Sequence, residues 1–222
     1  MSDAPIPNLA EAPVRRARGR PRKTADERDD GNRRQDLLRA AAHLFRQKGY
    51  AATSTRDIAA AAGMRSGSPF YHFDSKQALL AAVMLEGMQR GLRHQAARLA
   101  PDGAPPAERL HALVRSHFDV LLGPDSDFIP VMLYEWRSLT PEQRADVHAL
   151  RQHYESAWLP VLQALHAMGS LRGDPSLVRL MIFGALNWSV QWYEARAGGA
   201  TLDDLTDVAL QLFLHTPSGT RP

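Results

Sequence analysis

Four side chains able to contact nucleic acid lie within nine residues of one another, at Ser68, Tyr71, His72 and Lys76. Hydroxyl, imidazole and ammonium groups of this kind hydrogen-bond base edges and phosphates in protein–DNA complexes. A short helix that carries them is slim enough to enter a DNA major groove. This stretch is therefore a candidate DNA-binding element.

The residues before this element predict a helix and a tight turn that would position it. Ser54 can cap a helix start, and Asp57 three residues later completes a capping-box pattern. Gly63 can take the left-handed conformation that a sharp interhelical turn requires, and Pro69 fits the first turn of a following helix. The pattern indicates a helix-turn-helix unit, although helical hairpins that never bind DNA share it.

A third helix is predicted just upstream, over residues 33–50. Its apolar positions recur at helical spacing, and Gly49 occupies the place of a C-terminal cap. The helix would pack behind the two-helix unit and complete a three-helix module. The apolar face consists of Leu37, Leu38, Ala41, Leu44 and Phe45.

Residues 34–80 resemble the DNA-binding domain of the TetR family of transcriptional regulators. The resemblance implies an all-α protein in which a three-helix helix-turn-helix module, residues 33–80, joins a larger helical domain, residues 81–216, that binds an effector and forms a dimer. It rests on Ala41-Ala42, Leu44-Phe45, Gly49-Tyr50, Thr53, Arg56-Asp57-Ile58-Ala59, Ala62-Gly63, Gly67-Ser68, Tyr71-His72-Phe73, Ser75-Lys76 and Leu79.

The same resemblance implies which residues contact DNA. Residues at the start of the first helix, and those leading into the second, would approach phosphates and base edges. Pro69 and Phe70 depart from the family pattern. The sequence therefore does not indicate which bases the protein recognises. The implied contacts are Ser54, Thr55, Arg56, Arg65, Ser66, Gly67, Ser68, Tyr71, His72 and Lys76.

The N-terminal residues 1–32 are expected to form a disordered basic tail, because they are rich in proline and charge and lack apolar periodicity. Within them, Arg18-Gly19-Arg20-Pro21 resembles the core of an AT-hook, whose arginines enter the minor groove. A plain basic tail that adds only non-specific attraction is the alternative. Residues 1–76 hold 15 Lys/Arg against 9 Asp/Glu, whereas residues 77–222 hold 12 against 15, so the positive charge lies in the half that would bind DNA.

Composition argues against several other classes of protein. The chain has no cysteine, which removes disulfides and thiolate metal sites, and it contains no metalloprotease or phosphate-loop motif. No apolar run is long enough to span a membrane, and no signal-peptide core is present at the N-terminus. We therefore expect a cytoplasmic protein that is not an enzyme and that uses no cofactor or metal.

The larger half predicts helices separated by proline and glycine. A break is expected near Trp158, because Pro160 falls inside an otherwise helical pattern, and capping signals mark helix starts at Thr140 and Thr201. The segment 175–196 is apolar on nearly every side, so a second subunit or the protein's own core must cover it. The expected helices span residues 75–99, 107–122, 127–138, 140 onward, 175–196 and 201–215.

In TetR-like proteins the last two helices pair across a two-fold axis, with Gly184 and Ala185 allowing close approach here. A dimer of this kind implies a palindromic operator. The segment 184–194 is similar to TetR-like regulators of fatty-acid and steroid breakdown, which implies a lipid-like or acyl-CoA effector. Large side chains that could surround a cavity, and histidines that could contact a ligand, are Phe118, Phe128, Tyr134, Trp136, Trp158, Trp188, Trp192, His111, His117, His153 and His166.

These observations predict a sequence-specific regulator that binds double-stranded DNA as a homodimer. It would act as a repressor released from its operator by a small molecule, although activation is not excluded by the sequence. A DNA-binding architectural protein without a small-molecule switch is the alternative. An interior cavity would favour the switch, and a solid core would favour the architectural protein.

Overall fold

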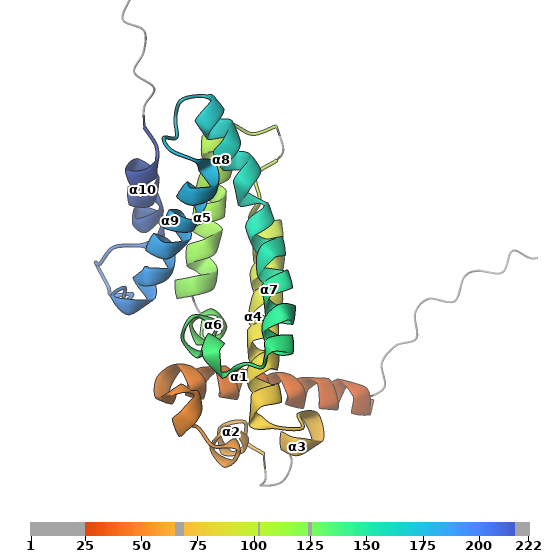
Figure 1. The fold of residues 1–222 in the computed structure, drawn as a ribbon. Coiled ribbons are helices and arrows are strands. Elements are labelled where there is room, and N and C mark those ends of the chain that lie inside the picture. The colour runs from red at the N-terminus through yellow and green to blue at the C-terminus, as the bar shows by residue number, and fades with distance from the viewer. Residues whose placement is uncertain (1–24, 65–68, 102, 124–125, 216–222) are drawn as a thin grey trace, which may run out of the picture.

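The computed structural model describes residues 25–64, 69–101, 103–123 and 126–215, with the backbone alone for 25–31 and 69–70. Within these ranges the protein is built of helices and contains no strand, which confirms the all-α prediction. A small module at one end carries α1–α3, and a long helix, α4, joins it to the rest (Figure 1). The first four helices are α1 (Ala25–Ala52), α2 (Thr55–Ala61), α3 (Pro69–His72) and α4 (Lys76–Arg98).

Helix α1 begins at Ala25, so the predicted start at Arg33 is wrong and the expected disordered tail does not reach residue 32. The helix is interrupted at Gly49, where φ is 80° and ψ is 161°. Gly63 also has a positive φ, 68°, in the turn after α2. Both values confirm that glycine is needed where the sequence predicted a cap and a tight turn.

The predicted capping residues form the bonds expected of them. The Ser54 hydroxyl accepts from the backbone N–H of Asp57 at 3.1 Å, and the Asp57 carboxylate accepts from the backbone N–H of Ser54 at 2.9 Å. The pKa of Asp57 is lowered because its carboxylate accepts from the Ser54 hydroxyl, at 2.7 Å, and from the Ser54 backbone N–H. Ser75 caps α4 by accepting from the N–H of Ala78 at 3.0 Å.

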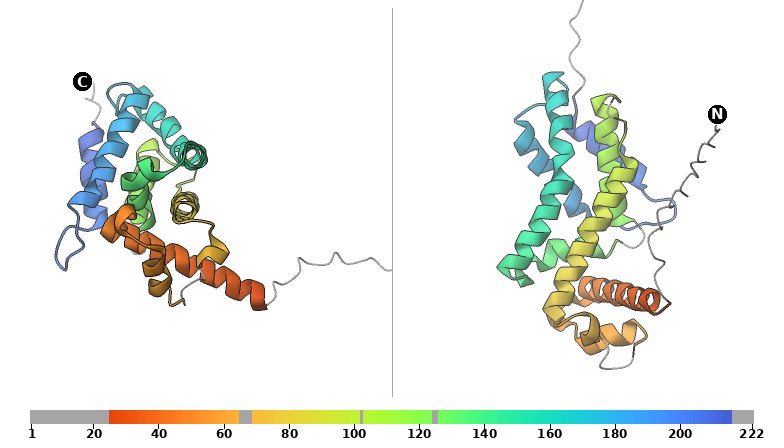
Figure 2. Two further views of the ribbon diagram at one scale, coloured as in Figure 1. Left: turned by 60° about the horizontal axis from the view of Figure 1, so that its bottom comes forward. Right: turned by 90° about the vertical axis from the view of Figure 1, so that its right-hand side faces the viewer.

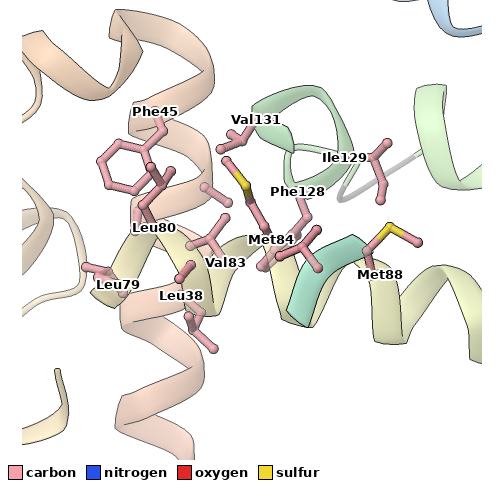
Figure 3. Packing of buried hydrophobic residues seen from close by; sticks show 14 of the residues in the cluster. Leu38, Phe45, Leu79, Leu80, Val83, Met84, Met88, Phe128, Ile129 and Val131 are labelled. Carbon is pink, nitrogen blue, oxygen red and sulfur yellow. The ribbon is translucent and has the colours of Figure 1, made fainter. Parts of the chain in front are cut away.

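A continuous apolar core joins α1, α4 and α6 (Figure 3). Phe45 and Leu38 of α1 meet Leu80 and Met84 of α4, and Val131 of α6 packs against the same group. The α1–α3 module is therefore packed directly on the larger domain. The core residues from these helices are Leu37, Leu38, Ala41, Ala42, Phe45, Leu79, Leu80, Val83, Met84, Met88, Phe128, Ile129 and Val131.

The larger domain places α4 beside α7 and packs α5 against α8 and α10 (Figures 1 and 2). A second core forms among α5, α8, α9 and α10, around the fully buried Trp158. Its helices are α5 (Pro106–Leu122), α6 (Phe128–Glu135), the 3₁₀ turn η1 (Trp136–Ser138), α7 (Pro141–Ser156), α8 (Trp158–Ala167), α9 (Pro175–Trp188), the 3₁₀ turn η2 (Ser189–Gln191) and α10 (Leu202–Phe213).

The helix boundaries of this domain follow the sequence prediction in most places. The break before Pro160 is confirmed, with α7 ending at Ser156 and α8 beginning at Trp158. The prediction that one helix runs from 175 to 196 is wrong, because α9 ends at Trp188. There the Ser189 hydroxyl donates to the carbonyl of Leu186 at 2.6 Å, and a 3₁₀ turn follows.

Candidate DNA-binding surface and ligand pocket

The candidate DNA-contacting residues lie at the outer end of the α1–α3 module. Ser54 caps α2, Thr55 is the first residue of that helix, and the side chain of Arg56 is exposed. Tyr71 is 76% exposed on α3, and its ring lies edge-on to that of His72 at 5.1 Å. Arg18, Arg20, Arg65, Ser66, Gly67 and Ser68 lie outside the described residues, so their DNA contacts stay predictions.

Lys76 has a role inside the protein that the sequence did not predict. Its ammonium donates to the backbone carbonyls of Tyr50 and Thr53, both at 2.8 Å, and lies 4.2 Å from the centre of the Tyr50 ring. An ammonium has three donors, so two of them are used to hold the end of α1. The predicted phosphate contact has at most one donor left for it.

Both ends of α6 are hydrogen-bonded to α1. Glu135 accepts from the backbone N–H of Tyr50 at 2.8 Å, directly after the interruption at Gly49. At the other end of α6, the Asp127 carboxylate accepts from Arg46 at 2.9 Å and lies 3.1 Å from the His43 ring. A shift of α6 would therefore be transmitted to the DNA-binding module.

A cavity of about 540 Å³ opens on the other side of α6, between α4, α5, α7 and α9. Its volume is within the usual range for small-molecule sites. Most of the wall is apolar, with polar groups gathered on α5, α7 and α9. The lining residues are Met88, Gly91, His117, Val120, Leu121, Ile129, Met132, Leu133, Trp136, His148, Arg151, Gln152, Tyr154, Glu155, Arg179, Leu180, Phe183 and Asn187.

A chain of buried hydrogen bonds lies in the wall of this cavity. Nδ1 of His117 is 3.0 Å from the Tyr154 hydroxyl, and Nε2 of His117 is 3.1 Å from Oδ1 of Asn187. Burial lowers the pKa of His117 from its ordinary 6.5 to about 4, against the opposing effect of the Asn187 bond. Burial also raises the pKa of Tyr154. The ring of His117 is therefore neutral at physiological pH.

The exposed residues of the cavity wall, Arg151, Gln152 and Leu180, lie on α7 and α9, so we infer that the cavity opens between these two helices. Glu155 forms ion pairs with Arg179 and, at 3.6 Å, with Arg151. Arg151 is exposed and its guanidinium lies 5.7 Å from the centre of the Trp136 ring. The cavity thus has an apolar interior and a polar, mostly cationic entrance.

The sequence assigned no ligand residues, and only some of the large side chains and histidines that could have surrounded a cavity line this one. His117 and Trp136 do, whereas Phe118, Phe128 and Trp158 are buried in the cores. Tyr134, Trp188 and Trp192 are exposed, and His111, His153 and His166 are absent from the wall. Sequence reasoning missed Tyr154, Phe183, Asn187, Arg151 and Arg179, and the spacing of four between Arg179, Phe183 and Asn187 was the available signal for one shared helix face.

An exposed apolar surface lies on α9 and α10, which we call the α9–α10 face: Leu177, Leu180, Met181, Trp188, Val208 and Leu212. Each of these side chains is more than half exposed. At Gly184, a Cβ atom would meet no atom within 4 Å, so the backbone of α9 is open to close approach. Large exposed apolar side chains gathered on neighbouring helices are typical of a surface that another protein chain covers.

Comparison with known proteins identifies the family. Residues 37–83 match the family described as bacterial regulatory proteins, tetR family, and residues 103–216 match the tetracyclin repressor-like C-terminal domain. The chain belongs to the TetR family. It is thus a DNA-binding transcriptional regulator, and the second match covers all the helices that surround the cavity except α4.

Individual relatives extend the similarity over most of the chain. The chain is 30% identical to the HTH-type transcriptional repressor KstR2 of Rhodococcus jostii (strain RHA1), covering 85% of this chain and 93% of KstR2. It is 27% identical to AibR, solved in complex with isovaleryl coenzyme A and operator DNA, with a TM-score of 0.74 over 82% of this chain and 97% of that one. A structure described as superantigen PfiT is 42% identical, with a TM-score of 0.67 over 82% and 96%.

Neither a membrane span nor a metal cluster is found in the described part of the chain. No helix there is long and apolar enough to cross a membrane. No group of three or more His, Cys, Asp or Glu side chains among those residues could hold a metal ion.

Proposed function

We propose that this TetR-family protein is a dimeric cytoplasmic repressor that leaves a palindromic operator when an acyl-CoA thioester enters the cavity. The observation that carries the proposal is the cavity itself, with an apolar interior suited to an acyl chain and Arg151 and Arg179 at its entrance. Guanidinium groups are well matched to the phosphates of coenzyme A. AibR, a similar fold, binds isovaleryl coenzyme A and operator DNA.

The cavity also favours a ligand-operated switch over the architectural alternative. A protein that only shapes DNA has no need of a space of about 540 Å³ inside its larger domain. The same wall includes Ile129, Met132 and Leu133 of α6, whose ends hold α1 through Asp127 and Glu135. A ligand that repositions α6 would move the DNA-binding module.

The α9–α10 face supports the dimer. Leu180 belongs both to this face and to the entrance of the cavity, so ligand and partner subunit would lie next to each other. A dimer with two-fold symmetry presents two equivalent recognition elements, which match two half-sites of a palindrome. A ligand acts on DNA affinity only through its different affinity for the two arrangements of the dimer.

The test begins with genomic fragments selected by the purified full-length protein at moderate salt. A recurring palindrome is the expected result, and it provides a labelled operator for fluorescence anisotropy. Isovaleryl-, octanoyl- and palmitoyl-CoA are then titrated onto the complex, with free coenzyme A as the control. Release of the operator by at least one thioester, but not by coenzyme A, supports the proposal; no release by any of them contradicts it.

A variant with a filled cavity separates specific release from competition with DNA for basic residues. Gly91 lines the cavity, and a Cβ there would lie 3.6 Å from both Tyr154 and Val120, an ordinary contact distance. Gly91→Leu, once circular dichroism and operator binding show that it is folded, should fail to respond to the thioester. If Gly91→Leu is released as readily as the unchanged protein, the thioester acts elsewhere.

A further inference from the structure

We propose that the side-chain amide of Asn187 donates a hydrogen bond to the thioester carbonyl oxygen of the ligand and makes the cavity selective for thioesters over thioethers. This inference rests on the proposed acyl-CoA function. The donor to the carbonyl oxygen is Nδ2 of Asn187. The selectivity depends on the hydrogen-bond chain that orients this amide.

The direction of the chain follows from the atoms that meet. Oδ1 of Asn187 can only accept, so Nε2 of His117 carries the hydrogen. The neutral ring then leaves Nδ1 as an acceptor, and the Tyr154 hydroxyl donates to it. In this arrangement the amide oxygen is occupied by the histidine, and the two N–H donors of Asn187 are the groups left for a ligand.

Those donors have no protein partner within the described residues, although Asn187 is half-buried and lines the cavity. A donor with no partner at a cavity wall loses free energy unless water or a ligand accepts from it. A carbonyl oxygen is the acceptor that an acyl thioester brings. The ether sulfur of the corresponding thioether is a much weaker acceptor.

The amide is held in a fixed orientation by the residues around His117. The imidazole lies edge-on to Phe183 at 5.3 Å and to Trp158 at 5.9 Å. Gln95 donates to the backbone carbonyl of Tyr154 at 3.1 Å and accepts from the Trp158 ring nitrogen at 3.3 Å. The residues around His117 are thus held by hydrogen bonds or ring contacts. The amide donor of Asn187 is therefore fixed in place before a ligand binds.

The position of Asn187 along α9 fits the order of groups in an acyl-CoA. Arg179, Phe183 and Asn187 follow at intervals of four residues and all line the cavity. Eight residues of helix rise roughly 12 Å, so Asn187 lies about two turns along α9 from Arg179, on the same side of the helix. The wall also includes the apolar side chains Ile129, Met132 and Leu133 of α6, against which the acyl chain would lie.

The test compares each thioester with a ligand that lacks only the carbonyl. Isovaleryl-, octanoyl- and palmitoyl-CoA and their S-alkyl-CoA counterparts are titrated into the full-length protein by calorimetry. We expect the thioester to bind about tenfold more tightly than the matching thioether, the value of one well-placed neutral hydrogen bond. The ratio of the two affinities, not either affinity alone, is the quantity that decides.

Asn187→Asp removes the amide donors but keeps an oxygen for His117, so the hydrogen-bond chain can still close. We expect this variant to lose the preference for the thioester entirely. Gln163→Glu is the matched control, because it makes the same amide-to-carboxylate change at an exposed residue of α8 that does not line the cavity. Its preference should stay about tenfold.

Several outcomes would overturn the assignment. Equal affinity of the unchanged protein for thioester and thioether contradicts it, and so does a preference that survives Asn187→Asp in a folded protein. If Asn187 were only structural, the substitution would weaken both ligands equally and leave the ratio unchanged. If Asn187→Asp does not fold, the ratio in the unchanged protein decides. Binding of no CoA ester at all refutes the proposed function and this inference together.

Discussion

The DNA-binding module and the larger domain differ in how completely each covers its apolar surface. In α1 the side chains of Leu37, Leu38 and Ala41 are fully buried, and Tyr71 is the large exposed side chain among the described residues of the module. The larger domain leaves the α9–α10 face exposed and encloses a cavity. The module is thus complete within its own chain, whereas the larger domain is shaped for a second subunit and a ligand.

The largest expected effect comes from charging the α9–α10 face. Met181 and Leu212 are 69% and 72% exposed, and a dimer would bury both. Met181→Glu combined with Leu212→Glu should give a monomer, because two buried carboxylates per subunit cannot be desolvated without partners. Operator affinity should then fall at least about 100-fold through the loss of bivalent binding. Light scattering and operator anisotropy measure the two effects.

Leu99→Glu is the control for this experiment, since Leu99 is 39% exposed at the end of α4, away from the α9–α10 face. It should remain dimeric and bind the operator normally. A double variant that stays dimeric would show that subunits meet on another surface, and the contrast between the two regions would no longer hold.

The second expected effect is the pH dependence of stability that burial of His117 produces. Its pKa is about 4 in the folded protein and near 6.5 when unfolded. Between these values the unfolded chain binds a proton that the folded chain does not, so stability falls as the pH falls from 6.5 to 4. The loss from this one group is about 3 kcal/mol, and it has no effect above pH 6.5.

Urea unfolding at pH 7 and pH 4.5 measures this loss. His117→Gln should be less stable at pH 7 but should lose clearly less stability on acidification than the unchanged protein. The exposed His153 provides the control, and His153→Gln should keep the original slope. Identical slopes for all three proteins would mean that His117 is not held neutral by its surroundings.

A third prediction separates internal support from DNA contact within the module. Lys76→Met removes the ammonium that holds the carbonyls of Tyr50 and Thr53, so the free energy of unfolding should fall by about 2 kcal/mol. Arg56→Ala, at an exposed position, should leave stability within about 0.5 kcal/mol. It should weaken operator binding and reduce the slope of log affinity against log salt concentration by about one.

Chemical denaturation and a salt series of operator titrations distinguish these two residues. If Lys76→Met leaves stability unchanged and only weakens DNA binding, the ammonium contacts DNA, as the sequence predicted. If Arg56→Ala unfolds the module, the division between supporting and contacting residues is wrong.

The smallest expected difference lies between two glycines of the module. Gly49, at φ 80° and ψ 161°, has a backbone conformation open essentially to glycine, so Gly49→Ala should cost about 2 kcal/mol. Gly63 has a φ of 68°, in the left-handed region, and a Cβ atom there would meet no atom within 4 Å, so Gly63→Ala should cost about 1 kcal/mol. Equal losses measured by urea unfolding would contradict the distinction.

How much could be predicted from the sequence also differs between the two regions. Capping boxes at Ser54 and Thr140 and the turn glycines act over a few residues, so their positions were predicted correctly. The end of α9 and the cavity wall depend on contacts between distant segments. His117, Tyr154 and Asn187 are far apart in the chain, and no local pattern shows that they meet. The bond from Glu135 to Tyr50 has the same origin.

The most direct test of the proposed switch is the distance between the two DNA-binding modules of the dimer. The chain has no cysteine, so Ala60→Cys at an exposed position of α2 gives one spin label per subunit. Pulsed electron paramagnetic resonance should give one narrow distance with operator and a different distance with the releasing thioester. An unchanged distance at a thioester concentration that releases the operator would contradict a mechanism in which filling the cavity moves the DNA-binding modules.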